Sequence, residues 1–246
     1  MNHISLIHGI HQGLTNPNWT HDLQNELELN LPRVAIETES YSAGAFPPWN
    51  IWVKNPRYAK AHANRIKQFS DAYTRSRLPA TAASTVSSLP SLGVHLVAHS
   101  NGTNIAVGAV QRLAKMSVKV NTLILMGSAV HSDIERSGLA DLVSRGALNR
   151  VVAYCSDDDR VIRPLQSIPG CYGSLGTRGL ERDGKPVGLR VEKFQPIEEA
   201  HPWASDRFSY VTRWFEGFGH SEWMHRDQKE ATFRAITSDL RLQSLY

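Results

Sequence analysis

A serine at position 100 stands where an apolar, strand-like run changes into a helical pattern. A serine hydroxyl is a weak nucleophile, so it needs exposure and a neighbouring base before it can attack a carbonyl carbon. A sharp strand-to-helix turn provides that exposure, and it requires small residues two positions before and after the serine. Here these residues are Ala98 and Gly102, so the pattern Gly-x-Ser-x-Gly occurs with alanine in its first position. We therefore predict that Ser100 is a nucleophile.

Three consecutive aspartates, Asp157, Asp158 and Asp159, follow a later strand-like run at residues 150–154. A carboxylate in such a loop can orient the histidine that serves a nucleophilic serine. Three adjacent carboxylates would also suit a divalent cation, but a cation needs further oxygen ligands, and we find none that the sequence places nearby. We therefore expect no metal ion here.

The chain has 11 histidines, and one candidate base among them, His220, stands just past the last strand-like run. Glycines precede it and let the loop fold the imidazole toward the serine. His225 is the nearest alternative, although it lies close to the start of the final helical pattern. The segment is not a zinc-protease pattern, which requires His-Glu-x-x-His on one helix face. Most other histidines, such as His62 and His201, are expected at the surface or in loops.

Taken together, the serine turn, the aspartate loop and the late histidine give a sequence that resembles the α/β-hydrolases of the lipase and esterase group. The similarity runs from His8-Gly9 to the C-terminal helical pattern, and family members often carry His-Ser-x-Trp where this chain has His220 to Trp223. The resemblance implies the chain order Ser, acid, His, and it favours His220 as the base because the family's histidine comes just past the last strand. It also implies hydrolysis through an acyl-enzyme on Ser100. It implies no metal and no organic cofactor.

The resemblance also implies which aspartate is the acid. In this family the acid lies in a loop of the form Asp-x-Val or Asp-x-Ile, where the apolar residue packs down while the carboxylate turns toward the histidine. Only Asp159 has such a residue two positions on, Val161. Asp159 is therefore the expected acid, and Asp158 is the alternative.

An oxyanion hole of two backbone N–H groups is the remaining part that the resemblance implies. One N–H belongs to Asn101, the residue after the nucleophile. The other comes from the loop after the first strand, where His8-Gly9-Ile10 matches the family's His-Gly-x form. Ile10 is the expected donor and His11 the alternative, while His8 is expected to brace the loop.

Short apolar runs alternate with helical patterns along the chain, which predicts an α/β fold with a mostly parallel central sheet flanked by helices on both faces. The resemblance implies that this is the α/β-hydrolase fold. The nearly continuous apolar character of the central runs is typical of strands buried on both faces. The expected strands cover residues 4–7, 34–36, 94–98, 122–126, 150–154 and 210–215, with one further candidate at 189–194. The first expected helix begins at Asn16 and ends before Pro32, with an apolar stripe of Trp19, Leu23 and Leu27. The second follows Ser100 and has a stripe of Ile105, Ala109 and Leu113. The third begins near Asp227 and buries Phe233, Ile236 and Leu240. Gly108 keeps the second of these helices small on one side, so we expect that side against the sheet.

Two stretches depart from the alternation, residues 41–90 and residues 163–209. Both are expected to be loop or lid-like excursions from one α/β-hydrolase domain that spans residues 1–246. The first stretch follows the second strand and should lie near the carboxyl edge of the sheet, where ligands bind in open α/β sheets. Its aromatic residues Phe46, Trp49 and Trp52 are candidates for an acyl pocket or a small lid, or they plug the base of the loop.

The composition excludes several other classes of protein. The chain of 246 residues is 41% apolar and 20% charged, with a formal net charge of +4, and its Lys and Arg are scattered rather than clustered as in a nucleic-acid binder. There is no signal-peptide pattern and no apolar run near the roughly 18 residues that span a bilayer. Cys155 and Cys171 are expected to be free thiols in a cytoplasmic monomer or homodimer.

The sequence therefore predicts a serine hydrolase that acts on a small-molecule carboxylic ester. The aromatic residues of the 41–90 stretch favour an acyl ester over a highly charged substrate. Two alternatives stay open: an amidase, thioesterase or peptidase that uses the same triad, and a binding protein that keeps the fold without the activity.

Overall fold

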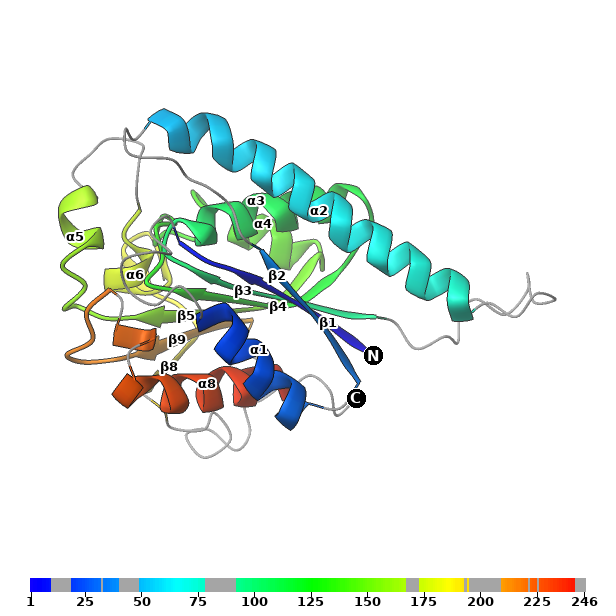
Figure 1. Cartoon of the computed structure of the whole chain (residues 1–246). Coiled ribbons are helices and arrows are strands. Elements are labelled where there is room, and N and C mark those ends of the chain that lie inside the picture. The colour runs from blue at the N-terminus through cyan, green and yellow to red at the C-terminus, as the bar shows by residue number, and fades with distance from the viewer. Residues whose placement is uncertain are drawn as a thin grey trace.

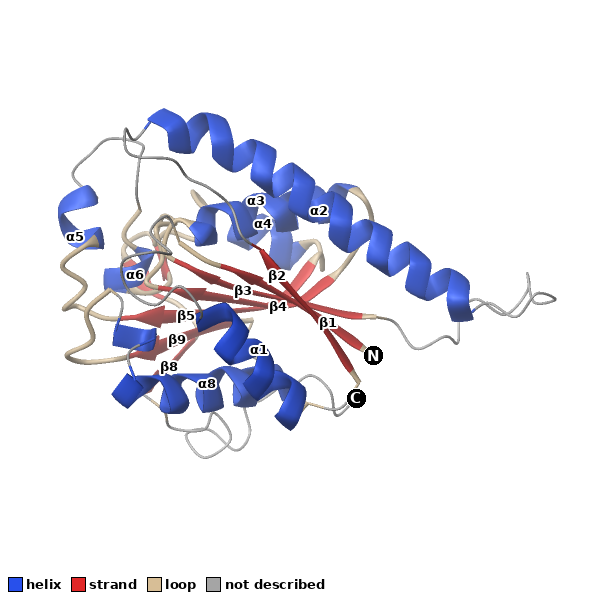
Figure 2. Cartoon of the chain, in the orientation of Figure 1, coloured by secondary structure: helices blue, strands red, loops and turns tan. Residues whose placement is uncertain are grey.

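In the computed structural model, a twisted seven-stranded sheet forms the centre of the molecule (Figures 1 and 2). The structure describes residues 1–9, 19–31, 33–39, 49–77, 92–166, 173–192, 194, 209–220, 222–224 and 226–241. The strands lie in the order β2-β1-β3-β4-β5-β9-β8, and every neighbouring pair is parallel. This confirms the predicted fold class.

The strands of the sheet coincide with the predicted apolar runs. They are β1 (Asn2–Ile7), β2 (Val34–Glu39), β3 (Gly93–His99), β4 (Val120–Met126), β5 (Leu148–Cys155), β8 (Leu189–Glu192) and β9 (Tyr210–Trp214). Two short strands that the sequence did not indicate, β6 (Glu181–Arg182) and β7 (Lys185–Pro186), pair antiparallel outside this sheet. Because all strands of the sheet run the same way, their carboxyl ends meet at one edge.

Helices cover both faces of the sheet. On one face lie α2 (Trp49–Arg77), α3 (Gly102–Lys115) and α4 (Leu139–Ser144), and on the other lie α1 (Trp19–Asn30) and α8 (Arg226–Arg241) (Figure 1). The short helices α5 (Ile162–Leu165) and then α6 (Leu175–Arg178) come after β5, and η2 (Glu222–Met224) comes after β9. Among the described residues, no helix is long and apolar enough to span a membrane.

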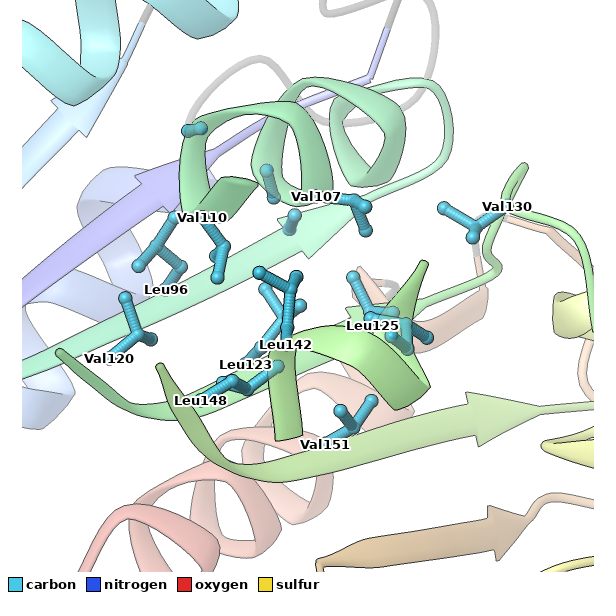
Figure 3. Close-up of a cluster of buried hydrophobic side chains, with 14 of the residues drawn as sticks. Leu96, Val107, Val110, Val120, Leu123, Leu125, Val130, Leu142, Leu148 and Val151 are labelled. Carbon is cyan, nitrogen blue, oxygen red and sulfur yellow. The ribbon is translucent and has the colours of Figure 1, made fainter. Parts of the chain in front are cut away.

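The core on the α2–α4 face consists mainly of aliphatic side chains (Figure 3). Leu96, Leu123 and Val151 lie on neighbouring strands, and Val107 and Val110 of α3 pack against this face of the sheet. All seven residues of β3 are buried, so the strand that precedes Ser100 is enclosed on both faces. This burial gives the turn after β3 a rigid base.

The opposite core is richer in aromatic side chains, and the rings of Tyr154, Phe215, Phe218 and Trp223 pack against one another there. The predicted stripes of the two helices on this face are confirmed: Trp19, Leu23 and Leu27 of α1 and Phe233, Ile236 and Leu240 of α8 are buried. The predicted helix signals at Asn16 and Pro32 lie outside the described residues.

Helix α2 is the element that the sequence analysis missed within residues 41–90. It has 29 residues and contains Pro56, which discouraged a helix assignment because proline removes a hydrogen-bond donor from a helix interior. Its buried stripe is small and aliphatic, with Ala59, Ala63 and Ile66 at helical spacing. That spacing was the available signal, but many charged residues surround it.

Gly108 of α3 faces α2, and the expectation that it faces the sheet is wrong. A Cβ atom at Gly108 would lie 3.1 Å from the Cβ of Ala59, so the two helices approach closely at this point. Small residues on both helices allow this approach, and they set the position of α2 relative to the turn at which α3 begins.

Candidate active site

Ser100 lies in the turn between β3 and α3, at the carboxyl edge of the sheet. Its backbone has a φ angle of +55°, a left-handed conformation that is unusual for a residue with a side chain and that marks local strain. The Ser100 N–H donates to the carbonyl of Met126 at the end of β4, over 3.0 Å. The turn therefore holds the serine side chain away from the regular ladder of the sheet, partly exposed.

The glycines around this turn are required by close approaches of the backbone. A Cβ atom at Gly9 would lie 2.7 Å from the Cβ of Ser100, so the loop after β1 passes directly beside the nucleophile. A Cβ atom at Gly102 would lie 2.5 Å from the carbonyl oxygen of His8 and 2.8 Å from that of Ile7. Gly102 is thus small because α3 begins against the end of β1.

Thr103 braces the turn from inside α3. Its hydroxyl donates to the Ser100 carbonyl over 2.6 Å and accepts from the Ala129 N–H over 3.1 Å. The Ser128 hydroxyl also lies 3.2 Å from it. The loop after β4 is therefore tied to the turn after β3 by buried hydrogen bonds.

His220 lies between Ser100 and Asp159. Its Nδ1 is 2.8 Å from Asp159 Oδ2, and its Nε2 is 2.9 Å from Ser100 Oγ. With the Nδ1–H donating to the carboxylate, Nε2 is the acceptor for the serine hydroxyl. The structure thus brings together the three residues that the sequence nominated, from the ends of β3, β5 and β9.

Gly127, at the end of β4, supports this arrangement and was not singled out from the sequence. It has a φ angle of +47°, and a Cβ atom there would lie 3.2 Å from His220 Nδ1 and 3.4 Å from Asp159 Oδ2. The backbone therefore passes directly against the His–Asp pair. A glycine at the end of an apolar strand was the only sequence signal for it.

Asp159 is fully buried, and its carboxylate is completely engaged. Oδ1 accepts the N–H groups of Val161 and Ile162 over 3.1 and 2.9 Å, while Oδ2 faces His220. Burial by itself would raise the pKa of this carboxyl, but the hydrogen bond and charge of His220 and the two backbone N–H groups outweigh it and lower the pKa below the usual value. The group is therefore ionised at neutral pH.

The expectation for Val161 is wrong. Its side chain is 48% exposed, and Ile162, three positions after Asp159, is the residue that packs down into the core. Asp157 and Asp158 are both exposed. The direction of the Asp159 side chain is thus fixed by the hydrogen bonds at the start of the short helix α5 rather than by a valine two positions on.

His99 is a second buried histidine next to the site. Its Nε2 lies 2.9 Å from the carbonyl oxygen of His220, and the centroids of the two rings are 4.9 Å apart. Burial, and after it the neighbouring His220, lowers the pKa of His99 to about 3, so its ring is neutral and Nε2–H is the donor. His99 thereby anchors the backbone of the loop that carries His220.

The expected oxyanion donors are divided between described and undescribed residues. Asn101 follows Ser100 at the start of α3 and is 1% exposed, whereas Ile10 and His11 lie outside the described residues. His8 is buried and its Nδ1 contacts the Gly9 carbonyl, a bracing contact within the loop.

The expected pocket aromatics cannot be followed as side chains. Phe46 lies outside the described residues, and Trp49 and Trp52 are described only as the backbone of the first turns of α2. These turns lie at the carboxyl edge (Figure 1). Nearby, the amides of Asn55 in α2 and Asn101 form two mutual hydrogen bonds. Neither Asn55 nor His99 was predicted from the sequence, because neither contact follows from sequence spacing.

The other residues that the sequence analysis considered are placed as follows. His62 is buried, so its expected surface position is wrong, and His201 and His225 lie outside the described residues. Cys155 is a buried free thiol, and Cys171 is not among the described residues. Within the described part of the chain, no group of three or more His, Cys, Asp and Glu side chains is arranged to hold a metal ion.

A family model described as "Alpha/beta hydrolase of unknown function (DUF900)" matches residues 50–178, more than half of the 246 residues. The chain belongs to this family of α/β-hydrolases. The matched segment runs from α2 to α6 and includes Ser100 and Asp159, while His220 follows it. A comparison with curated protein sequences finds no significant match.

Solved structures with a similar course of the chain share little sequence with it. The NocB thioesterase domain from the nocardicin cluster is 15% identical, with 98% of this chain and 94% of that chain covered and a TM-score of 0.49. A thermostable carboxyl esterase from Bacillus coagulans is 12% identical, with 98% and 89% covered and a TM-score of 0.46.

Proposed function

We propose that this α/β-hydrolase is a serine hydrolase that cleaves carboxylic esters through an acyl-enzyme on Ser100. The observation that carries the proposal is the position of His220, which hydrogen bonds through Nδ1 to Asp159 and through Nε2 to Ser100. A neutral imidazole held in this way is a base for the serine hydroxyl, and the buried carboxylate stabilises the imidazolium that forms.

The first half of the reaction forms the acyl-enzyme. His220 Nε2 takes the hydroxyl proton while Ser100 Oγ attacks the ester carbonyl, and the negative charge moves to the carbonyl oxygen. The imidazolium then gives the proton to the leaving alcohol as its C–O bond breaks. In the second half a water attacks the acyl-enzyme with the same proton transfers, and the acid product leaves Ser100 in its starting form.

The developing oxyanion is assigned to the backbone N–H groups of Asn101 and Ile10. Asn101 supports this assignment by its position, because it directly follows the nucleophile at the start of α3. Preorganised N–H groups at this point stabilise the tetrahedral state without rearrangement during the reaction. No cofactor takes part in this scheme.

The substrate is expected to be a small-molecule acyl ester, with Phe46, Trp49 and Trp52 lining its acyl pocket or lid. We expect the enzyme to act in the cytoplasm as a monomer or homodimer. These expectations are drawn from sequence composition and from the position of residues 41–90 after β2.

A fluorophosphonate probe followed by mass spectrometry of the labelled peptide tests the nucleophile. We expect a single adduct on Ser100, with ester hydrolysis lost in proportion to labelling. An unlabelled protein, under conditions that label a known serine esterase, would overturn the proposal.

The bond class is tested separately with p-nitrophenyl esters of increasing acyl length, the matching p-nitroanilides and an acyl thioester. We expect kcat/KM to be highest for an ester. A higher kcat/KM for the anilide or the thioester would replace the ester assignment while leaving the triad intact.

A further inference from the structure

The side chain of Asn101 is held by another helix. Asn55 Nδ2 donates to Asn101 Oδ1 over 2.9 Å, and Asn101 Nδ2 donates to Asn55 Oδ1 over 3.0 Å. Asn101 stands at the N-cap position of α3, where an asparagine commonly caps the helix with its own side chain, yet it makes no such capping bond. Its amide is directed across to α2 instead.

Packing between the two helices fixes this amide pair. One turn after Asn55, Ala59 of α2 meets Gly108 of α3 at the close approach described above. Asn55 precedes Ala59 as Asn101 precedes Gly108, so α2 and α3 run in the same direction here, as Figure 1 also shows. Two contact points, one apolar and one polar, therefore set the position of α2 along α3.

The pair is matched in its chemistry as well as its geometry. Each amide supplies one donor and one acceptor, so both bonds are satisfied only while both residues are asparagine or glutamine. An aspartate at either position would direct a carboxylate oxygen at an amide oxygen. An alanine at position 55 would leave both polar atoms of the Asn101 amide without this partner.

We propose that Asn55 is a positioning residue for the oxyanion hole, acting through Asn101. The backbone N–H of Asn101 belongs to the peptide that joins it to Ser100, a residue that itself has a strained left-handed φ angle. With its side chain anchored on α2, Asn101 resists rotation, and its N–H keeps its direction toward the reacting carbonyl oxygen. This inference rests on the proposed function, because it assumes that this N–H receives the oxyanion.

A consequence is that α2 takes part in the chemistry although it carries none of the triad. The same turns of α2 begin at Trp49, beside the expected substrate pocket. Contacts of a substrate with these turns would therefore be transmitted to the oxyanion donor through this partly buried amide pair.

Kinetics of Asn55→Ala, Asn101→Ala and the double variant test the proposal. Removing an oxyanion donor lowers kcat by about 10²–10³-fold, and misdirecting one costs part of that. We expect Asn55→Ala to lower kcat for a p-nitrophenyl ester about 10-fold with little change in KM. Because the two residues act as a unit, the double variant should be no slower than the slower single variant.

A thionoester, in which sulfur replaces the carbonyl oxygen, provides a second measurement: the ratio of ester to thionoester kcat/KM, which a general loosening of the structure would not change. The wild-type hole is shaped for oxygen, so we expect Asn55→Ala to narrow the ratio of ester to thionoester kcat/KM. Asn64→Ala is the matched control, since Asn64 is a partly buried asparagine further along the same helix. It should leave both rates and the ratio unchanged.

The outcomes separate this inference from the proposed function. A wild-type enzyme without ester turnover or Ser100 labelling would remove the proposed function and this inference with it. Normal wild-type turnover, with Asn55→Ala equal to Asn64→Ala in kcat and in the thionoester ratio, would overturn only the role of Asn55. If Asn55→Ala does not fold, the equal-sized Asn55→Asp variant replaces it, with the same expected loss of kcat and the same overturning result.

Discussion

Among the described residues, two serine–histidine pairs have the same Oγ–Nε2 distance and very different surroundings. Ser100 Oγ lies 2.9 Å from His220 Nε2, and Ser5 Oγ lies 2.9 Å from His62 Nε2. The first pair is at the carboxyl edge of the sheet. The second joins the middle of β1 to α2, where Ser5 is 0% and His62 1% exposed. A hydrogen bond between these atoms therefore does not by itself make a nucleophile.

The difference comes from where each serine stands on its strand. Ser5 is paired on both sides within the sheet, to Glu37 of β2 and Leu96 of β3, and α2 covers it. Ser100 is one residue past the end of β3, in a strained turn beside Gly9. A substrate carbonyl can approach Ser100, which lies outside the hydrogen-bonded ladder of the sheet, but not Ser5, which lies within it. Burial makes the Ser5 pair structural, and the turn makes the Ser100 pair available for chemistry.

The contrast between the two serines is tested most directly by removing each hydroxyl in turn. We expect Ser100→Ala to lower ester turnover by about 10⁴-fold or more, since the nucleophile and its proton are lost. The thermal midpoint should hardly change, because the methyl group fits the same turn. Ester kinetics and thermal unfolding measure the two effects.

Ser5→Ala is the matched control and should show the reverse. It removes a buried hydrogen bond, which costs about 1–3 kcal/mol of unfolding free energy when the partner stays enclosed, while turnover stays close to that of the wild type. If Ser5→Ala abolished turnover without destabilising the protein, the contrast between the two pairs would be wrong.

The carboxylate behind His220 gives the next largest expected effect. Asp159→Asn keeps the size of the side chain but favours the wrong imidazole tautomer, so we expect kcat to fall by about 10³–10⁴-fold. Asp158→Asn, on the exposed neighbour, should leave kcat nearly unchanged. Steady-state kinetics of the two variants decide the assignment, and a large loss in Asp158→Asn with a harmless Asp159→Asn would transfer the role to Asp158.

The smallest expected effect is the pH dependence of stability that comes from His3, a neighbour of the enclosed Ser5–His62 pair. His3 lies on the same face of β1 as Ser5, and burial, helped by His62, lowers the pKa of His3 to about 4 even though Glu37 lies 3.6 Å from its Nε2. In the unfolded chain a histidine titrates near 6.5. Between these values the unfolded state binds more protons, so the stability present above about pH 6.5 is lost as the pH falls toward 4.

Urea unfolding at pH 7.5 and pH 5 measures this loss. We expect His3→Gln to lose less stability between the two pH values than the wild type, by about 2 kcal/mol, because about 1.5 pH units of this interval lie between the two pKa values and each unit corresponds to about 1.4 kcal/mol. His21→Gln, on the exposed side of α1, should behave like the wild type. An unchanged pH dependence in His3→Gln would show that His3 is not enclosed as a neutral group.

The fold was predictable where a local pattern coincides with burial. Strands such as β3 and β4 read as continuous apolar runs because they are covered on both faces, and the stripes of α1 and α8 followed helical spacing. Helix α2 was not predicted, because its buried face is narrow and made of small residues and because Pro56 interrupts the helical pattern. Packing against α3, rather than local helix propensity, makes this segment one of the helices that cover the sheet.

The candidate site divides along the same line. The sequence by itself determined the turn around Ser100, since its small residues and the adjoining strand and helix are neighbours in the chain, and it nominated Asp159 and His220 by their order. Only the tertiary structure decided that these side chains meet and that Ile162, rather than Val161, packs into the core. It also decided that His99 hydrogen bonds to the His220 backbone and Asn55 to the Asn101 side chain. The physical reason is range: a turn is specified by adjacent residues, whereas a hydrogen bond between His99 and His220 joins residues 121 positions apart and exists only once the sheet brings its strand ends together.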